Sequence, residues 1–230
     1  RSDALGGCGV AGIGSSLKNP ANVLQGEKFS LSFSQCNLYN LDLSKEIMEI
    51  KGKVLRIPLS LTINKLTDDE GPYQERVYTY TMGKKIHSLS IGVSLRRLLL
   101  DAEASGEGWS LDLGGIYDIK QNTAVGIAAR DLFSVINYST GRVEIPELSL
   151  SMGFVHNRGD ILYTAEMENF SRLKLGLEKK FGNDLMLRVG YTEQQLTAGL
   201  GLRKGKLTFD YAYVPHALGN AHYLYVKLGL

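Results

Sequence analysis

Two neighbouring stretches decide the fold: LMLRVGYT at residues 185–192 and LTAGLGLR at residues 196–203. In both, apolar residues alternate with charged, hydroxyl or glycine residues. Successive side chains of a β-strand point to opposite faces, so this alternation predicts two strands that each have one apolar and one polar face. The two stretches are separated by only a few residues, which favours an antiparallel pair.

The same alternation recurs along most of the chain, and long helical periodicity is absent. It predicts an all-β protein with about fourteen antiparallel strands. We expect strands near 28–36, 38–45, 53–64, 74–82, 85–97, 108–118, 122–132, 146–156, 160–168, 172–181, 184–193, 195–203, 206–214 and 221–230.

The predicted connections alternate in length. Tight turns are expected at 82–85, 120–122, 157–160, 181–184 and 204–206, and longer loops at 65–73, 98–107, 133–145 and 215–220. Short turns at one end and longer loops at the other are typical of outer-membrane barrels, whose short turns are periplasmic. The exceptions are 45–52, a longer connection on the short side, and the short links at 169–171 and 194.

Composition excludes some function classes. The 230 residues include 26 basic and 24 acidic side chains, a net charge of +2, so no basic field indicates nucleic-acid binding. The mean hydropathy is close to zero, which fits a soluble protein and equally a membrane barrel with a polar interior. No apolar run reaches the roughly 18 residues of a spanning helix. The opening residues 1–4 show no signal peptide, so we expect that any export signal has been removed.

Alternation alone does not say which face points outward, and a soluble β-sandwich or barrel is the alternative. Glycine and serine are frequent on the polar face, which suits a crowded interior better than a water-facing surface. Aromatic residues gather near strand ends on the apolar face, as in interfacial girdles. The last predicted strand ends at Leu230 and should pair with the strand near 28–36, because an unpaired edge in lipid is costly.

The barrel interpretation assigns a direction to each face. Outward residues should include Leu59, Leu111, Leu175, Leu187, Phe209 and Val226. Charges of both signs should face the lumen and pair across it, which lowers their desolvation cost. These predicted lumen residues are Arg56, Arg96, Asp112, Arg130, Glu166, Lys174, Glu178, Arg188, Arg203, Asp210 and Lys227.

The N-terminal segment is rich in glycine, which permits tight and irregular backbone. A barrel of about fourteen strands is wider than side chains alone can fill, so a plug is expected. We predict that residues 1–26 form this plug and residues 27–230 the barrel; a disordered tail is the alternative. The predicted plug residues are Gly6, Gly7, Gly9, Gly12, Gly14, Asn19 and Pro20.

Catalytic and metal-binding patterns are absent from the sequence. Cys8 and Cys36 are too few for a disulfide framework; two free thiols are expected, with one plug-to-wall disulfide as the alternative. His216 and His222 could approach each other across a turn, but turn and interface histidines are more common than a metal site. We expect no enzyme activity, no cofactor and no metal.

Both ends of the chain resemble a known family. The opening ALGGCGVA at 4–11 with Asn19-Pro20-Ala21 is similar to the hatch of FadL-like outer-membrane barrels. The end, LGLR at 200–203 and FDYAYVPH at 209–216 with His222, is similar to the last hairpins of the PorV/PorQ branch. The likeness covers about a third of the chain; the middle matches in strand rhythm alone.

The resemblance implies a bacterial outer-membrane protein and two functions. Its PorV-like tail implies a scaffold or secretion accessory that contacts outer-membrane lipid and acts with protein partners in an envelope complex. The FadL-like head implies the alternative, passive transport of hydrophobic or small molecules past the hatch. The more specific tail and the short predicted loops favour the scaffold at this point. A soluble β-protein or an outer-membrane enzyme has no support beyond the shared alternation.

Overall fold

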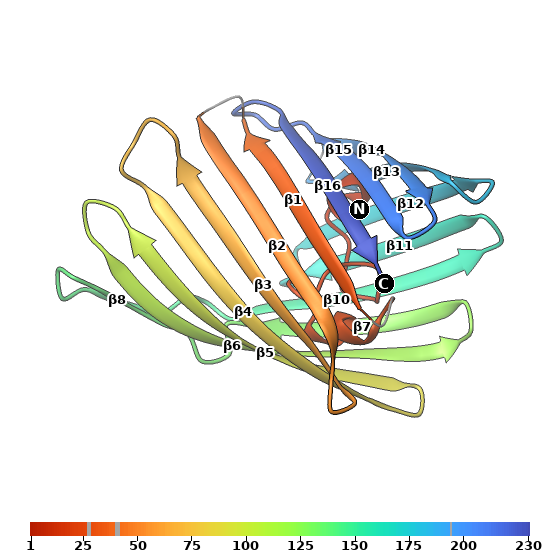
Figure 1. Ribbon diagram of the computed structural model, residues 1–230, viewed down its shortest axis with the longest axis horizontal. Helices are drawn as coiled ribbons and strands as arrows, with labels where there is room; N and C mark the ends of the chain where they lie inside the picture. Colours follow the sequence, from red (N-terminus) through yellow and green to blue (C-terminus); the bar gives the residue numbers. More distant parts are fainter. Residues whose placement is uncertain (27–28, 40–41, 194) are drawn as a thin grey trace.

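A computed structural model describes residues 1–26, 29–39, 42–193 and 195–230. Figure 1 shows a ring of tilted strands with the N-terminal segment, in red, inside it. The elements are η1 (Asp3–Leu5), η2 (Pro20–Leu24), β1 (Ser30–Leu38), β2 (Leu43–Val54), β3 (Ile57–Asp68), β4 (Gln74–Ile86), β5 (Leu89–Asp101), β6 (Gly106–Lys120), β7 (Thr123–Arg130), β8 (Val135–Tyr138), β9 (Val143–Glu144), β10 (Ser149–Arg158), β11 (Ile161–Glu168), β12 (Arg172–Phe181), β13 (Leu185–Thr192), β14 (Gln195–Lys204), β15 (Leu207–Val214) and β16 (Ala221–Gly229).

Fourteen of these strands, β1 to β7 and β10 to β16, close into one antiparallel barrel, which confirms the predicted fold. The first and last strands pair as predicted, with Phe33 opposite Val226 and Cys36 opposite Tyr223. The ring also needs β5 to pair with β6, where Leu95 lies opposite Leu111. Closure leaves no free edge among these strands, and only helices and closed barrels satisfy their backbone polar groups in lipid.

The two faces of the barrel differ as the alternation predicts. Leu175, Leu187, Phe209 and Val226 lie on the outer face with 36–46% of their surface exposed. The inner face carries buried serine, threonine, glycine and charged side chains. An apolar exterior around a polar interior is the reverse of a soluble protein and the pattern of a membrane barrel.

Two predicted strand boundaries are wrong. The expected strands 38–45 and 53–64, with a connection at 45–52, are one hairpin: β2 runs without interruption to Val54 and β3 starts at Ile57. The turn is Leu55-Arg56, with φ of 50° and 70°. Two-residue turns of this conformation are usually recognised by Asn-Gly or Asp-Gly, and neither pair is present here. Residue 28 of the first predicted strand and residues 40–41 of the second lie outside the described residues.

The predicted tight turn at 82–85 is also wrong, because β4 continues to Ile86 and the chain reverses at His87 and Ser88. Gly83 therefore lies within a strand, opposite Gly92 of β5. The predicted loop 133–145 contains a further hairpin: β8 pairs with the loop end of β6, and β9 pairs with β8. In Figure 1 this hairpin extends beyond the barrel at the loop end. No helix in the described part of the chain is long and apolar enough to cross a membrane.

Candidate functional site: the plugged lumen

A belt of glycines on the inner wall makes room for residues 1–26. A Cβ added at Gly83 would lie 2.6 Å from Val23 Cγ1, and one at Gly176 would lie 2.8 Å from Leu5 Cβ. Real Cβ atoms do not approach this closely, so these two wall positions must be glycine. Added Cβ atoms at four more wall positions would overlap plug backbone or side chains: Gly92, Gly126, Gly190 and Gly199.

The belt shows its function most clearly on β6, where two glycines are adjacent. A Cβ on inward Gly114 would overlap Oδ1 of Asn19, whereas a Cβ on outward Gly115 would make an ordinary 3.8 Å contact with Ile127 Cγ2. Only the inward glycine is required by the plug.

The plug has two short 3-10 helices that contact opposite parts of the wall. Helix η1 packs on β12 to β15, and η2 packs on β3 to β6. Asn19 caps η2 by accepting a hydrogen bond from Ala21 N (2.9 Å), and its Nδ2 donates to Val10 O (2.7 Å) and to the wall carbonyl of Gly115 (3.2 Å). One fully buried side chain thus joins the helix cap, the other half of the plug and the wall.

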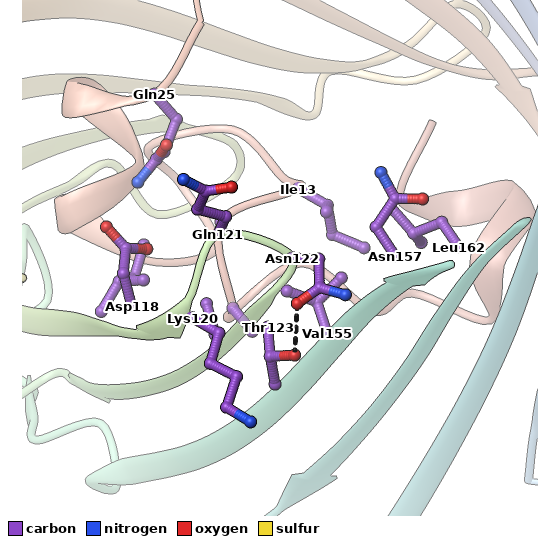
Figure 2. Close-up of a pocket in the computed structure, with 14 residues that line it drawn as sticks. Ile13, Gln25, Asp118, Lys120, Gln121, Asn122, Thr123, Val155, Asn157 and Leu162 are labelled. Carbon is purple, nitrogen blue, oxygen red and sulfur yellow. Dashed lines mark hydrogen bonds between the residues drawn. The ribbon is translucent and has the colours of Figure 1, made fainter. Parts of the chain in front are cut away.

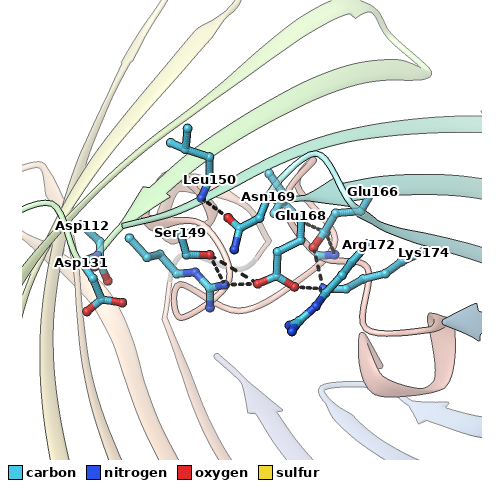
Figure 3. A network of polar contacts seen from close by, with 12 residues as sticks. Asp112, Asp131, Ser149, Leu150, Glu166, Glu168, Asn169, Arg172 and Lys174 are labelled. Carbon is cyan, nitrogen blue, oxygen red and sulfur yellow. Dashed lines mark hydrogen bonds and ion pairs between the residues drawn. The ribbon is translucent and has the colours of Figure 1, made fainter. Parts of the chain in front are cut away.

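A charged cluster on the wall holds the first half of the plug (Figure 3). Oε2 of buried Glu166 accepts hydrogen bonds from the backbone N–H groups of Gly9 (2.8 Å) and Val10 (3.0 Å). Lys174 Nζ lies 3.3 Å from the other Glu166 oxygen and 2.8 Å from Glu168, which also pairs with Arg130 (2.6 Å). The lysine and the arginine lie beside the acidic pair whose Glu166 binds the plug backbone.

A second buried cluster holds the start of the chain. Arg1 makes a bidentate contact with Glu178 (2.9 and 2.7 Å). Glu178 and Asp210 are joined by Arg188, at 2.7 and 2.6 Å. Each of these three wall residues is at most 7% exposed, and a bidentate arginine contact is among the stronger polar contacts available to them.

A third cluster lies where β7 ends. Arg96 contacts Asp112 (3.0 Å) and also pairs with Asp131, whose backbone N–H donates to Asp112 (3.0 Å). Asp131 has φ of 61°, so this cluster fixes the turn by which the chain leaves β7 toward β8. It does not contact the plug through any described hydrogen bond, and its position indicates a role in shaping the wall.

Three predicted lumen residues lie outside these clusters. The prediction that Arg56 faces the lumen is wrong. Arg56 lies in the turn after β2 and is exposed, because β2 extends past its predicted boundary. Arg203 is also exposed, near the tight-turn end of β14, opposite Thr208. Lys227 is half-buried on β16, and its Nζ lies 3.7 Å from the Cβ position of Gly26.

The predicted plug residues have different roles. Gly6 and Gly12 have φ of 68° and 94°, which other residues adopt at a cost. Gly6 N also donates to Thr197 Oγ1 (3.1 Å) on the wall. Gly9 and Gly14 contact each other, since a Cβ on Gly14 would lie 2.9 Å from Gly9 Cα. Gly7 has φ of 84°, and Pro20 begins η2.

Sequence reasoning missed the contacts of the plug with β2 and β3. Lys51 Nζ donates to the carbonyls of Asn22 (3.0 Å) and Gln25, and Glu49 accepts from Ser16 Oγ (2.7 Å). The region 45–52 was expected to be a connection, so no inward positions were assigned to it. The alternation from Met48 to Val54, with Glu49 and Lys51 between apolar residues, was the available signal.

Above the plug, toward the loop end, part of the inner wall is apolar. The inward, half-buried side chains there include Ile47, Leu66, Val77 and Leu98, on β2 to β5. Val77 and Leu98 lie directly opposite each other, and Asn64 separates Val77 from Ile47 in the same row. Lys45 and Glu75 flank Leu66, one row nearer the loop end. This wall can contact an apolar molecule that enters from the loop end.

Beneath the plug, at the tight-turn end, lies a cavity of about 180 Å³ (Figure 2). Ile13 and Gln25 of the plug line one side, and the turn between β6 and β7 with parts of β10 and β11 lines the other. Apolar Val155 and Leu162 share the lining with polar and charged side chains: Asp118, Lys120, Gln121, Asn122, Thr123 and Asn157. A cavity of about 150 Å³ is enough to hold benzene.

The cysteines and histidines form no joint site. Cys8 and Cys36 are both free and buried, in agreement with the expected absence of a disulfide. The His216 ring lies tilted against the Tyr39 ring with centroids 4.5 Å apart, while His222 forms a hydrogen bond with the Tyr211 hydroxyl (2.7 Å). Within the described ranges, no three His, Cys, Asp or Glu side chains gather to hold a metal ion.

Comparison with known proteins gives the fold. No protein-family model and no curated protein sequence matches the chain. Among solved structures, the toluene transporter TodX of Pseudomonas putida superposes with a TM-score of 0.68 at 12% identity, covering 98% of this chain and 95% of that one. The toluene transporter TbuX of Ralstonia pickettii gives 0.62 at 12% identity, covering 99% and 96%.

A FadL homologue of Pseudomonas aeruginosa gives a TM-score of 0.61 at 10% identity, covering 93% of each chain. None of these three structures is a PorV or PorQ protein, so the branch predicted from the tail is not confirmed. At these identities the likeness shows a shared fold, the closed antiparallel barrel of fourteen strands.

Proposed function

We propose that this protein is an outer-membrane channel that lets small apolar molecules pass a plugged lumen. The observation that carries the proposal is the position of residues 1–26, between an apolar inner wall on the loop side and a cavity on the turn side. A molecule that moves through the barrel meets these three features in order.

The membrane location is supported by the outer face. Leucine, valine, phenylalanine and tyrosine side chains stand exposed on successive strands, and a band of this kind requires lipid as its solvent. The tight turns, such as Leu55-Arg56 and His87-Ser88, are then periplasmic, and the β8–β9 hairpin and the longer loops are extracellular.

The selectivity for apolar molecules is supported by the inner surfaces. Ions and sugars crossing the lumen would have to displace the plug from Glu166, Glu178 and Lys51, which hold it by buried charged contacts. A small hydrocarbon needs no hydrogen-bond partner and fits both the apolar wall and a cavity of about 180 Å³. The solved structures TodX and TbuX, which are described as toluene transporters, have the same architecture.

A scaffold or secretion role, which the tail favoured, stays an expectation. The structural neighbours TodX and TbuX, which share the architecture, are described as toluene transporters. The proposal therefore takes transport in preference to the scaffold.

Uptake of a hydrocarbon by whole cells tests the proposal. A host that lacks its own hydrocarbon channel should take up radiolabelled toluene several-fold faster when it expresses this protein, with no gain in uptake of a disaccharide. Leu98→Asp places a charge on the apolar wall and should abolish most of the gain, whereas Leu98→Met should keep it. Equal uptake by cells with and without the protein would contradict transport of this substrate class.

A further inference from the structure

Four strands carry an outward-facing cation at their tight-turn ends, and the plugged lumen does not explain these cations. On β4, β10, β12 and β14, an exposed cation interrupts or ends the outward series of apolar residues at the tight-turn end. On β4, for example, outward Met82 is followed two residues later by Lys84, and on β14 Leu202 is followed by Lys204. The four outward cations, which we call the outer cation ring, are Lys84, Arg158, Lys179 and Lys204.

These cations have no acidic partners. In the described part of the chain, none of the four lies within 4.0 Å of a carboxylate. Lys179 Nζ lies 5.3 Å from the Phe181 ring, on the same outward face. A lysine beside an interfacial aromatic ring commonly extends its stem along apolar surface and holds its ammonium in the headgroup layer.

The turns beside the ring add to its positive charge. Turn and strand-end residues at this end include basic Arg56, Lys120, Lys180 and Lys206, against acidic Asp118, Asp160 and Asp184. Asp118 is already paired with Lys85 at 2.7 Å. The tight-turn end is therefore basic over its circumference.

The opposite end carries acidic side chains beside its cations. Outward Arg97 is paired with Glu107 at 2.8 Å, and Arg172, on the inward series of β12, is paired with Glu193 at 3.0 Å. Its loops carry acidic residues that form no salt bridge with a described cation, among them Asp101 and Glu103. The two ends of the barrel thus differ in charge. Charges that served only solubility would not have to be distributed unequally between the two ends.

We propose that the outer cation ring binds anionic phospholipid headgroups in the leaflet that faces the tight turns. The partner follows from position and charge: ammonium and guanidinium groups without a carboxylate partner stand at the tight-turn edge of the apolar band, where phosphodiester groups lie. Lysine binds a phosphate as a point charge, and arginine binds it through two parallel hydrogen bonds. The inference rests on the membrane location in the proposed function and does not depend on what the lumen carries.

Two tryptophan reporters test it in reconstituted full-length protein. Trp109, the only tryptophan of the chain, lies outward near the loop end and reports on that interface. A second protein, with Trp109→Phe and Phe181→Trp, reports beside Lys179. Each is reconstituted in phosphatidylcholine containing brominated phosphatidylglycerol or brominated phosphatidylcholine, and quenching gives the relative affinity of the two lipids at each end.

We expect phosphatidylglycerol to be favoured about fivefold at the Phe181→Trp reporter, the factor that corresponds to about 1 kcal/mol per cation near an anionic surface. The ratio at Trp109 should be close to one. Changing all four ring residues to Gln should bring the Phe181→Trp ratio close to one. The matched control, Lys65→Gln with Arg76→Gln, removes two outward cations of the loop end and should leave that ratio unchanged.

Equal ratios at the two reporters, or a preference that survives the four Gln substitutions, would overturn the proposal. Binding of the ring to peptidoglycan sheets without any lipid preference would also overturn it and assign the ring to a cell-wall polymer. The substituted side chains are exposed, so the variants should fold. Folding is checked by the heat-dependent shift of the barrel in gel electrophoresis. Failure of the unmodified protein to insert into vesicles would contradict the membrane location itself, which separates that outcome from failure of the ring.

Discussion

Glu166 of β11 accepts a hydrogen bond from the backbone N–H of Gly9, at 2.8 Å, inside the barrel. The same carboxylate oxygen accepts a second bond from Val10 N at 3.0 Å. The wall thus holds the plug by its main chain, and any plug residue without a bulky side chain could occupy these positions. The specificity lies in the wall residue, which has to be a buried acid with a cation beside it.

Glu166→Ala should release the first half of the plug. Two backbone donors lose their acceptor, and an unsatisfied buried donor costs about 1–3 kcal/mol. Cys8 reports the release: it is fully buried, and burial, followed by the Glu166 carboxylate, raises the pKa of its thiol to about 12. Because the thiolate is the reactive form, Cys8 of the unmodified protein should react very slowly with maleimide and that of Glu166→Ala much faster.

Cys36 on β1 provides the internal control. It belongs to the wall and should stay unreactive in both proteins until the barrel unfolds. Glu168→Gln is the matched variant, since Glu168 pairs with Lys174 and Arg130 and has no described contact with the plug. Equally fast labelling of Cys8 in the unmodified protein would show that Glu166 does not hold the plug.

Arg188→Met should destabilise the barrel by about 3–5 kcal/mol, because it leaves two buried carboxylates without their shared cation. Arg188 contacts both Glu178 and Asp210 and is only 3% exposed. The measurement is reversible unfolding in urea with lipid vesicles. Arg172→Met removes an exposed pair with Glu193 and should cost at most about 1 kcal/mol. Similar losses for the two variants would mean that the interior is well hydrated around Arg188.

Leu175→Arg should cost about 2–4 kcal/mol in a bilayer, since an outward cation near the midplane is exposed to lipid. Leu175 lies between outward Leu173 and Leu177 on β12. The same change at Leu202, next to outward Lys204 at the tight-turn end, should cost at most about 1 kcal/mol. Unfolding in vesicles gives both values, and a larger cost at Leu202 would place the membrane at a different level on the barrel.

The barrel could be predicted from sequence because alternation acts within one strand and needs no knowledge of its neighbours. The errors fell where a local signal was missing or misleading. Leu55-Arg56 form a turn without glycine or asparagine, and Gly83 resembled a turn residue while it serves the plug. The β8–β9 hairpin is too short for alternation to show.

The kinds of residue that form the site could be predicted from the sequence, but the contacts between them could not. Inward charges and a glycine-rich plug follow from the two faces and the composition. Which charges meet depends on register and on residues far apart: Arg1 binds Glu178, and Gly9 binds Glu166. Glycines such as Gly126 gave no separate signal, because a glycine in a strand has several explanations until the plug is placed against it.

Single-channel conductance of two adjacent glycine variants tests most directly whether the plug closes the lumen. Gly114→Ala should push Asn19 away from the wall, whereas Gly115→Ala adds the same methyl group to the outer face of the same strand, where a 3.8 Å contact accepts it. We expect the unmodified protein and Gly115→Ala to be almost silent in planar bilayers and Gly114→Ala to show frequent openings. An unmodified protein that conducts as an open pore, or two variants that behave alike, would contradict it.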